Sequence, residues 1–589
     1  MENVDRQLSQ IRAMMRAVLK KERRNWILPE PLRAQPGLEP FSPVFRQILH
    51  GRGVTRQSQL APWLETDLER APDPLLMKDM AVACDLIAHA VREGQRIAIY
   101  GDYDADGVTA CVTLARGLRS VGADVITYIP NRFTEGYGLN LDALKDLFAR
   151  GARLVISCDC GTNSIDVARN RPAGMRLIVT DHHEVGAERP PVDALINPKQ
   201  PDCAYPFDGL AACGVAYKML VALEQRVFCG RIDPAASLDA VALGTVADVV
   251  PLHAENRAIV RAGLRRLSER PAAGCAALLA VAGINPPVTA EQLAFQLGPR
   301  INAAGRMEDA VLALDLLMSE SREAADPLAQ RLHDQNAQRQ QLTADIVREA
   351  KAQVVDLDNA AAVIVMGASH WPLGVLGLAA SKLVEEFYRP TFVFNTEGDE
   401  WRASARSIEG FHLVECLQHC APLLHRFGGH AMAAGLTVRR ERFDELRACL
   451  ERYTAMRLNG DAFSRPIRIE ATAALADLKP SLHREIQLLA PFGVGNREPL
   501  LLSREVEVLR AETFGADRRH LRVHLRDRTA TAEAIAFDKA GTAAHLPGGR
   551  RVDLVYSLDC DRWDGLERVR LHLRDLRPAV QPALLLSAV

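Results

Sequence analysis

Four short apolar runs, three of them followed by acidic or histidine residues, set the main constraint on the fold of this chain. They cover residues 96–100, 124–129, 154–157 and 177–180 and alternate with amphipathic segments such as 141–149. Runs of this length predict buried strands, and the segments between them predict helices. Strands that alternate with helices favour a mostly parallel sheet, because each parallel strand needs a crossover connection.

Acidic and imidazole side chains follow three of these runs. The first run leads directly into Asp102, Asp104 and Asp106, the third leads into Asp159, and the fourth leads into Asp181, His182 and His183. The carboxyl ends of parallel strands meet at one edge of the sheet, where ligands bind in open α/β folds. We therefore expect these side chains to gather at one rim.

The composition of this rim predicts a divalent metal site. Three carboxylates within five residues repel one another unless cations neutralise them. Asp248, after the apolar run 240–247, can supply a further carboxylate. Oxygen ligands with one imidazole favour Mn²⁺ or Mg²⁺ over zinc.

Other interpretations of these acidic residues stay open at this point. A single Asp after a strand is often a helix cap, and an acidic loop can simply be solvated. A calcium loop would need a Glu at the position of Thr113. Cys416, His419 and Cys420 make a weaker case for zinc, and the twelve cysteines as a set are typical of free, buried thiols.

The rest of the chain predicts three further parts. A polar helical stretch, 324–355, has sparse apolar positions and is expected to connect two domains. A second α/β unit follows, with strands at 361–366 and 391–394, a helix at 374–387 and a Gly-rich turn at 426–435. Short strands at 506–509, 520–525, 532–537 and 551–558 predict a small barrel.

Composition excludes several classes of protein. Hydrophobic residues make up 48% and charged residues 25% of the 589 residues, as in ordinary globular proteins. No apolar run approaches the ~18 residues of a membrane span. The basic N-terminus lacks the apolar core of a signal peptide, so we expect a cytoplasmic protein with no membrane contact. A net charge of −2 provides no overall field that would attract a polyanion.

The motifs are recognisable as a set. GDYDADG, CDCGT, TDHH and GTVADVVPL resemble the four motifs of the DHH phosphoesterase superfamily. PNRFTEGYGL, GPRINAAGRM, RFGGHAMAAG and APFGVGN are similar to motifs of its RecJ family, the single-stranded-DNA-specific 5′→3′ exonucleases. The resemblance covers residues 45–589.

This resemblance implies an α/β architecture with three folded parts. A parallel-sheet DHH domain is joined by a long helix to a smaller α/β DHHA1 domain, and a C-terminal OB-fold β-barrel follows. The expected boundaries are 1–45 for an N-terminal extension, 46–275 for the DHH domain, 276–357 for the helical connector, 358–457 for the DHHA1 domain and 463–589 for the OB-fold.

The resemblance also assigns roles at the rim. Asp106, Asp159, His182 and Asp248 would hold the tighter ion, and Asp104 with the bridging Asp159 would hold a second. His183 would contact the scissile phosphate, and Asp102 would support the site. Where many relatives carry a histidine ahead of the first motif, this chain has Tyr100, which leaves occupancy of the second site open.

Substrate contacts are implied in several parts of the chain. They are Arg132, Tyr137, Arg300, Asn302, Arg306, Ser404, Arg406, Gly428, Gly429 and His430, with Arg132, Arg300, Ser404 and Arg406 around the 5′ end. Gly428 and Gly429 are equally compatible with a helix C-cap. In the barrel, Arg518, Arg519, His520 and Arg522 supply charge, while Phe514 and Phe537 are stacking or core residues. His370 precedes Trp371, the reverse of the usual family order, so no role is carried over to it.

The implied function is a metal-dependent exonuclease of single-stranded DNA that releases 5′-mononucleotides. Its expected context is recombination and repair, as a monomer helped by single-strand-binding protein and a repair helicase. One alternative is a phosphatase for pyrophosphate or short oligonucleotides, which the C-terminal barrel argues against. Another is an inactive scaffold, which the complete set of motif carboxylates and histidines argues against.

Overall fold

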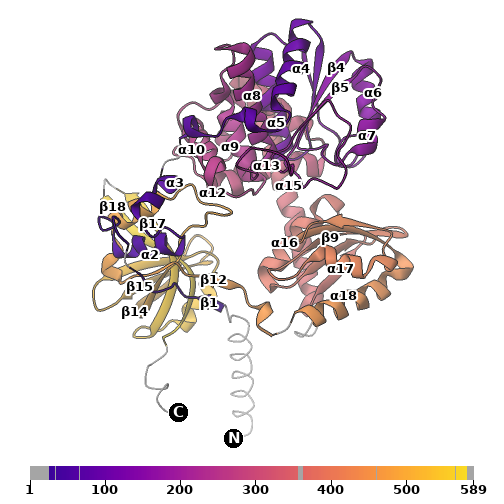
Figure 1. Cartoon of the computed structure of the whole chain (residues 1–589). Coiled ribbons are helices and arrows are strands. Elements are labelled where there is room, and N and C mark those ends of the chain that lie inside the picture. Colours follow the sequence, from indigo (N-terminus) through magenta and orange to yellow (C-terminus); the bar gives the residue numbers. More distant parts are fainter. Residues whose placement is uncertain are drawn as a thin grey trace. The chain divides into compact units, whose positions relative to one another are not determined.

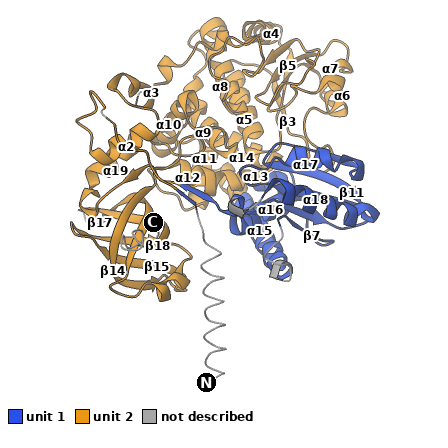
Figure 2. Ribbon diagram, turned by 60° about the horizontal axis from the view of Figure 1, so that its bottom comes forward, with its two compact units in different colours: residues 1–26, 303–309, 330–467 blue, residues 27–302, 310–329, 468–589 orange. Residues whose placement is uncertain are grey.

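The computed structural model describes residues 25–33, 35–64, 67–355, 362–458, 460–563 and 566–579. The basic N-terminal stretch and the first residues of the expected DHHA1 domain lie outside the described residues. Contacts divide the chain into two compact units (Figure 2). Among the described residues, the larger unit comprises those of 27–302, 310–329 and 468–579, and the smaller comprises those of 25–26, 303–309 and 330–467. None of the described helices is long and apolar enough to cross a membrane.

A five-stranded parallel sheet forms the centre of the larger unit (Figure 1). Its order is β3-β2-β4-β5-β6, from β2 (Arg96–Tyr100), β3 (Val125–Tyr128), β4 (Ala152–Cys158), β5 (Arg176–Thr180) and β6 (Ala194–Ile196). Helices cover both faces, so the central strands are apolar throughout and easy to predict. On one face, Leu144 and Leu147 of α6 (Leu141–Ala149) and Ala168 of α7 (Ile165–Arg169) pack against the strands.

Three helices pack closely beside this sheet. α5 (Ala105–Ser120) begins within the first acidic motif and contacts α8 (Ala212–Leu223) and α9 (Leu238–Ala247). Gly244 of α9 permits the close approach, because a Cβ there would overlap Oγ1 of Thr109 and lie 2.7 Å from Sγ of Cys213. The start of α5 and the end of α9, which both carry candidate ligands, are therefore fixed to one another.

The C-terminal part of the larger unit is a closed barrel. Its strands are β14 (Leu501–Phe514), β15 (His520–Arg526), β16 (Thr531–Ala536), β17 (Arg551–Trp563) and β18 (Leu566–Pro578), with the short β13 (Ala471–Thr472) beside β14. Pairing of β14 with β17 closes the ring. The core of the barrel also includes Phe45, Ile48 and Leu49 of α2 (Pro43–Gly51). A segment from the start of the chain is therefore an integral part of the barrel.

The smaller unit contains a five-stranded mixed sheet. The order is β10-β11-β9-β8-β7, from β7 (Ile364–Ala368), β8 (Thr391–Asn395), β9 (Glu400–Arg406), β10 (Arg426–Gly429) and β11 (Ala433–Arg439). Helices α16 (Leu376–Phe387), α17 (Leu413–His419) and α18 (Phe443–Arg457) accompany it. The long helix α15 (Arg322–Val355) begins in the larger unit and ends in the smaller, as expected for the connector.

The Gly-rich segment 426–435 is not the single turn that we expected. It forms two antiparallel strands, β10 and β11, with Gly429 paired to Ala434. Gly429 has φ +141°, and a Cβ there would lie 2.6 Å from Cα of Ala434. The glycines therefore serve a tight hairpin, and the helix C-cap interpretation is wrong.

We predict that Gly244→Ala lowers the stability of the larger unit by about 1–3 kcal/mol, because overpacking forces the three helices apart. The thermal unfolding midpoint of the whole chain measures this. Gly51→Ala is the control, since a Cβ at Gly51 meets nothing within 4 Å. Equal midpoints for the two variants would contradict the packing described.

Candidate active site

The rim of the parallel sheet lies where its strand order reverses. The chain runs from β2 outward to β3 and then crosses to β4 on the other side of β2. Such a reversal opens a crevice at the carboxyl ends of the two central strands. The loop with Asp102, Asp104 and Asp106 follows β2, and Asp159 follows β4. The predicted convergence of these strand ends is therefore present.

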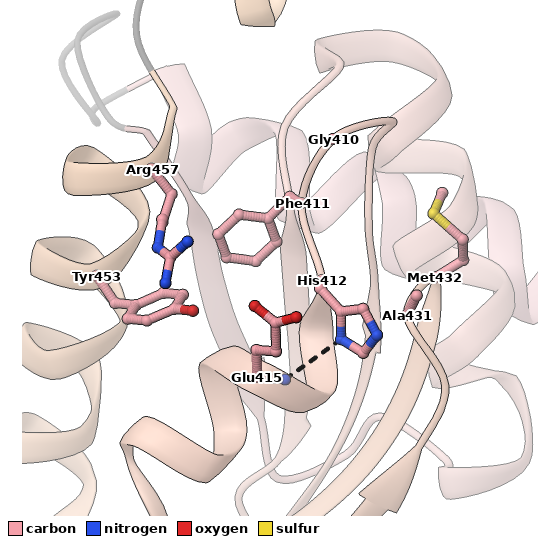
Figure 3. Close-up of a pocket in the computed structure, with 8 residues that line it drawn as sticks. All are labelled: Gly410, Phe411, His412, Glu415, Ala431, Met432, Tyr453 and Arg457. Atoms are coloured by element: carbon pink, nitrogen blue, oxygen red, sulfur yellow. Dashed lines mark hydrogen bonds between the residues drawn. The ribbon is translucent and has the colours of Figure 1, made fainter.

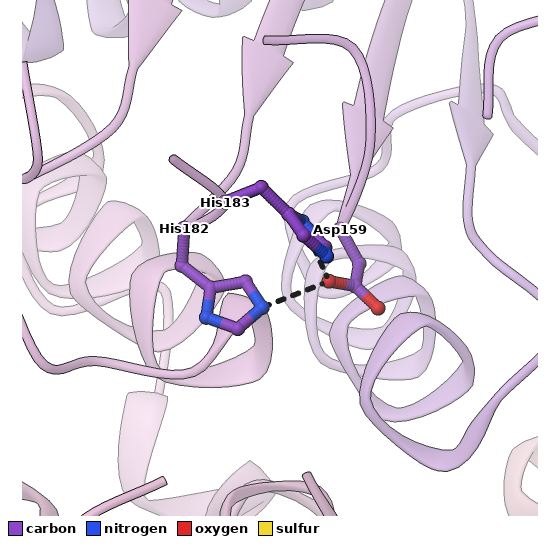
Figure 4. Close-up of side chains that lie close together, drawn as sticks. All are labelled: Asp159, His182 and His183. Carbon is purple, nitrogen blue, oxygen red and sulfur yellow. Dashed lines mark hydrogen bonds and ion pairs between the residues drawn. The ribbon is translucent and has the colours of Figure 1, made fainter. Parts of the chain in front are cut away.

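Four candidate metal ligands lie together: the carboxylates of Asp106, Asp159 and Asp248 surround one ring nitrogen of His182. Figure 4 shows Asp159 with His182 and His183. Nε2 of His182 lies 3.1 Å from Oδ1 of Asp159, 3.8 Å from Oδ2 of Asp106 and 3.7 Å from Oδ2 of Asp248. Asp159 itself has φ +66°, an uncommon conformation for a non-glycine residue that is frequent at functional sites.

Three overlapping groups of side chains have the spacing of metal ligands. They are Asp106 with His182 and Asp248, Asp102 with Asp104 and Asp159, and Asp159 with His182 and His183. The first and second groups contain residues that the family resemblance assigned to two ion sites, and that assignment stays a prediction. Asp159 belongs to the second group and also lies beside His182 of the first. Asp102, expected only to support the site, lies within the second group.

Backbone N–H groups hold two of the carboxylates. Oδ1 of Asp104 accepts hydrogen bonds from the amides of Asp106 (2.9 Å) and Gly107 (3.1 Å), so Asp104 caps α5. Asp106 accepts from Ala212 (2.6 Å) and Cys213 (2.9 Å) at the start of α8. Helix N-termini stabilise negative charge through these amides and the helix dipole. The cap interpretation and the ligand interpretation of Asp104 are thus compatible.

Asp181 contacts both site histidines, and the sequence assigned it no role. Its Oδ1 accepts hydrogen bonds from Nδ1 of His183 (2.8 Å) and from the backbone of His182 (2.8 Å), and its Oδ2 accepts from the backbone of Thr162 (2.9 Å). A carboxylate on one ring nitrogen fixes the tautomer and orientation of a histidine. The sequence signal for this contact was the position of Asp181 in the TDHH motif, directly before the two histidines.

Burial and mutual repulsion shift the pKa values of this cluster. Burial raises the pKa of Asp248 to about 9, and Asp106 and Asp104 add to the rise. Burial, with neighbouring carboxylates, also raises the pKa of Asp102, Asp106 and Asp159. A cation would remove the repulsion and restore the charged forms.

The two histidines shift in opposite directions. Burial lowers the pKa of His182, which favours the neutral imidazole that ligates metals. For His183, burial lowers the pKa, but the hydrogen bond and charge of Asp181 outweigh it and the pKa rises. Burial alone would raise the pKa of Asp181, but the hydrogen bonds from His183 and Thr162 outweigh it and that pKa falls.

An aromatic and basic rim surrounds His183. The Tyr137 hydroxyl lies 3.1 Å from Nε2 of His183 and donates to the Asp159 carbonyl (3.3 Å). Tyr137 is 56% exposed, which excludes a core role, and its ring meets Tyr103 edge-on. The Arg132 guanidinium lies 5.1 Å from the Tyr103 ring. Tyr100 is buried, and its hydroxyl donates to the Gly138 carbonyl (3.0 Å).

Two further predicted contacts lie on α13 (Gly298–Met307). Oδ1 of Asn302 accepts from the Ala105 amide (2.8 Å), so Asn302 steadies the acidic loop at the start of α5. Arg300 donates to the Gln296 carbonyl (2.6 Å) and is half-buried, which lowers its pKa. Substrate contact by either residue stays a prediction.

The smaller unit contains a cluster suited to an anion. Nη1 of Arg406 lies 3.1 Å from Oγ of Ser404. Both side chains pack against the first turn of α16, where a Cβ on Gly377 would lie 2.7 Å from Nη2 of Arg406 and 2.9 Å from Oγ of Ser404. A guanidinium beside a helix N-terminus is a common arrangement for binding phosphate. Arg306 instead reaches the Gly374 carbonyl (3.4 Å).

Gly428, Gly429 and His430 are exposed at the end of β10. The His430 amide donates to the Ala433 carbonyl (2.8 Å) within the hairpin. A hollow of about 430 Å³ lies just beyond this turn, and it is lined by Gly410, Phe411, His412, Glu415, Ala431, Met432, Tyr453 and Arg457 (Figure 3). Because the three predicted residues do not line this hollow, their contact with substrate stays a prediction.

Two other sequence-based candidates have structural explanations. Cys420 contacts Cys449 (Sγ–Sγ 2.8 Å), and His419 packs on Tyr453. Among the described residues no metal-ligand group forms around Cys416, so the zinc interpretation finds no support there. His370 bonds Glu349 (2.8 Å) on α15.

The barrel presents an aromatic cluster. Phe514, His520, Phe537 and His572 form a chain of ring contacts with centroids 5.2–6.5 Å apart, and the Arg522 guanidinium lies 5.0 Å from the Phe514 ring. Phe537 is 57% exposed, so it is not a core residue. Exposed rings beside a cation are suited to stacking on bases.

Comparisons with known proteins agree with this geometry. Three family models match: the DHH family N-terminal domain at 96–245, the DHHA1 domain at 359–456 and the RecJ OB domain at 469–575. The single-stranded-DNA-specific exonuclease RecJ of Bacillus subtilis is 36% identical over 91% of this chain and 68% of its own length. RecJ of Escherichia coli is 32% identical over 91% of this chain and 96% of its own length.

A solved structure matches nearly the whole chain. RecJ of Thermus thermophilus in complex with Mn²⁺ gives a TM-score of 0.79 at 30% identity, covering 95% of this chain and 80% of that one. The fold and the carboxylate–histidine rim define a hydrolase of the DHH phosphoesterase class. Within that class, the chain belongs to the RecJ family of single-stranded-DNA-specific exonucleases.

We predict that Asp181→Asn lowers kcat on single-stranded DNA by about 10–100-fold, because His183 loses the carboxylate that orients it. Steady-state digestion of a labelled oligonucleotide measures kcat, and circular dichroism checks folding. Asp166→Asn is the control, since the Asp166 side chain is 90% exposed on α7. Full activity of the folded Asp181→Asn protein would contradict this role.

Proposed function

We propose that this chain degrades single-stranded DNA from the 5′ end to 5′-mononucleotides, by hydrolysis at a centre that holds two Mn²⁺ or Mg²⁺ ions. The observation that carries the proposal is the convergence of five aspartates and two histidines at the strand-order reversal of one parallel sheet. The relative from Thermus thermophilus binds Mn²⁺ and, in a second structure, Mg²⁺.

The residues present fit two divalent ions. Oδ1 of Asp102 is buried without a hydrogen-bond partner, which is costly unless a cation neutralises it. Asp106, His182 and Asp248 would hold one ion, Asp102 and Asp104 the other, and Asp159 would contact both. When bound, such a pair activates a water and stabilises charge on the attacking and leaving oxygens.

The other residues bind and orient the phosphodiester. With Nδ1 donating to Asp181, a protonated His183 presents Nε2–H to a phosphate oxygen. The raised pKa of His183 favours that protonated form. The Tyr137 hydroxyl lies beside Nε2 of His183. The exposed ring of Tyr137 is suited to stacking on the adjacent base. Arg132, held over Tyr103, adds positive charge to the rim.

Directionality requires a group that recognises a terminal phosphate. The Arg406–Ser404 pair at the start of α16 supports a 5′-phosphate contact, because a guanidinium, a hydroxyl and a helix N-terminus together suit a dianion better than a bridging phosphodiester. The aromatic cluster of the barrel supports a contact with the strand farther from the end.

The cellular setting is part of the same proposal. A nuclease specific for single strands needs its substrate exposed, so a helicase that unwinds duplex and single-strand-binding protein are the expected partners in recombination and repair. We propose that the protein acts as a monomer in the cytoplasm, as the family resemblance implies.

The deciding experiment uses oligonucleotides labelled at either end, with Mn²⁺. We expect immediate release of labelled mononucleotide from the 5′ end, loss of activity with EDTA, and a fall of at least about a thousandfold in Asp159→Asn. Asp166→Asn and a matched duplex are the controls. Release from the 3′ end first would overturn the direction; hydrolysis of pyrophosphate alone, or binding without cleavage, would overturn the function.

A second prediction separates recognition of the end from chemistry. We expect wild-type protein to prefer a 5′-phosphorylated strand over a 5′-hydroxyl strand, and Arg406→Ala to reduce that preference by about 10–100-fold, since a hydrogen bond to a charged group contributes about 1.5–3 kcal/mol. Arg447→Ala, which removes a partly exposed α18 arginine paired with Glu451, is the matched control. An unchanged preference in Arg406→Ala would exclude this contact.

A further inference from the structure

One motif of the sequence, the APFGVGN stretch at residues 490–496, lies outside every site described above. It connects α19 (Pro480–Gln487) to β14 of the barrel. We call residues 489–496 the brace loop. Asn496, 1% exposed, fixes its shape by donating to the carbonyls of Leu489 and Pro491, both at 2.8 Å.

Two arginines outside the barrel strands hold this loop in place. Arg52, at the end of α2, donates to Oδ1 of Asn496 (2.6 Å). Arg257 of α10 (Ala254–Glu269), 2% exposed, donates to the carbonyls of Leu488 (2.8 Å) and Ala490 (2.9 Å). Hydrogen bonds from buried, charged donors are costly to break, so the brace loop is firmly attached to α10.

The brace loop packs against the segment that leaves Asp248. The Leu252 amide donates to the Val494 carbonyl at 2.6 Å. A Cβ on Gly493 would lie 2.6 Å from Cδ1 of Leu252, and one on Gly495 would lie 2.9 Å from Cβ of Pro251. Glycine is needed at Gly495, which combines this close approach to Pro251 with φ +73°, whereas at Gly493 the Leu252 side chain would have to move.

The path from Asp248 to Pro251 explains why this contact matters. Asp248 ends α9, and its amide still donates to the Gly244 carbonyl (2.9 Å). The next residue, Val249, has φ +66°, which a β-branched residue adopts only when its surroundings impose it. α9 anchors one side of this strained turn, and the brace loop anchors the other.

We infer that the brace loop is a positioning element for Asp248, through which the barrel sets the geometry of the metal centre. This inference rests on the proposed function. On this inference the barrel has a role in the metal centre besides the proposed contact with DNA. A change in the brace loop would move Asp248, whose Oδ2 lies 3.7 Å from Nε2 of His182.

The test compares two glycines of the barrel that share a left-handed conformation. Gly495 (φ +73°) faces Pro251, whereas Gly549 (φ +83°) has nothing within 4 Å of a Cβ. We expect Gly495→Ala to weaken Mn²⁺ binding, measured by calorimetry without DNA, by about tenfold. We expect kcat to fall with it, while the KM for single-stranded DNA stays unchanged. Gly549→Ala should match wild type in Mn²⁺ affinity, in kcat and in the KM for single-stranded DNA.

A second variant tests the inference in case Gly495→Ala does not fold. Asn496→Asp removes the donors to Leu489 and Pro491 without added bulk, and it should weaken Mn²⁺ binding in the same direction. Mn²⁺ affinity equal to that of Gly549→Ala in both folded variants, or a loss confined to DNA affinity, would overturn the inference. If wild-type protein cleaves DNA while these variants bind Mn²⁺ normally, only the inference fails; if wild type neither binds Mn²⁺ nor cleaves, the proposed function fails as well.

Discussion

Repulsion among buried carboxylates is the constraint around which the larger unit is organised. Asp102, Asp106 and Asp159 are almost fully buried, and burial of like charges is strongly unfavourable without compensation. The fold compensates with directed N–H groups: α5 at Asp104, α8 at Asp106, and the backbone after β4 and β5 at Asp181. The close packing of α5, α8 and α9 keeps these donors fixed, so the site is held in shape before any ligand arrives.

The parts of the fold that the sequence predicted well share one physical property. β2, β4 and β5 are covered on both faces, so they read as continuous apolar runs, and β2 begins and ends at the predicted residues. The convergence of the aspartates and histidines that follow these strands could be predicted from the geometry of a parallel sheet. β9 was missed because the buried positions of its sequence, EWRASAR, are the alanines Ala403 and Ala405, which give a weak strand signal. No role was assigned to Asp181 from the sequence, because its position in TDHH does not show that its carboxylate bonds the ring of His183.

The division into two units also separates two kinds of chemistry. The candidate metal ligands found among the described residues all belong to the larger unit, whereas Arg406, Ser404 and Gly377 belong to the smaller. The residues proposed for hydrolysis and those proposed for the terminal phosphate are therefore built on separately packed cores. Because the two sets do not share a core, substitutions that tune one need not disturb the packing of the other.

The participation of α2 in the barrel core has a consequence for synthesis on the ribosome. Ser42 bonds Glu485, 443 residues later, and Phe45, Ile48 and Leu49 pack among barrel side chains. At 5–20 residues per second, about 20–90 s of translation separate these partners. During that interval an apolar helix has no core to enter, which makes it a natural ligand for a chaperone. For the same reason, a barrel excised from residue 463 onward would lack part of its own interior and would be prone to aggregate.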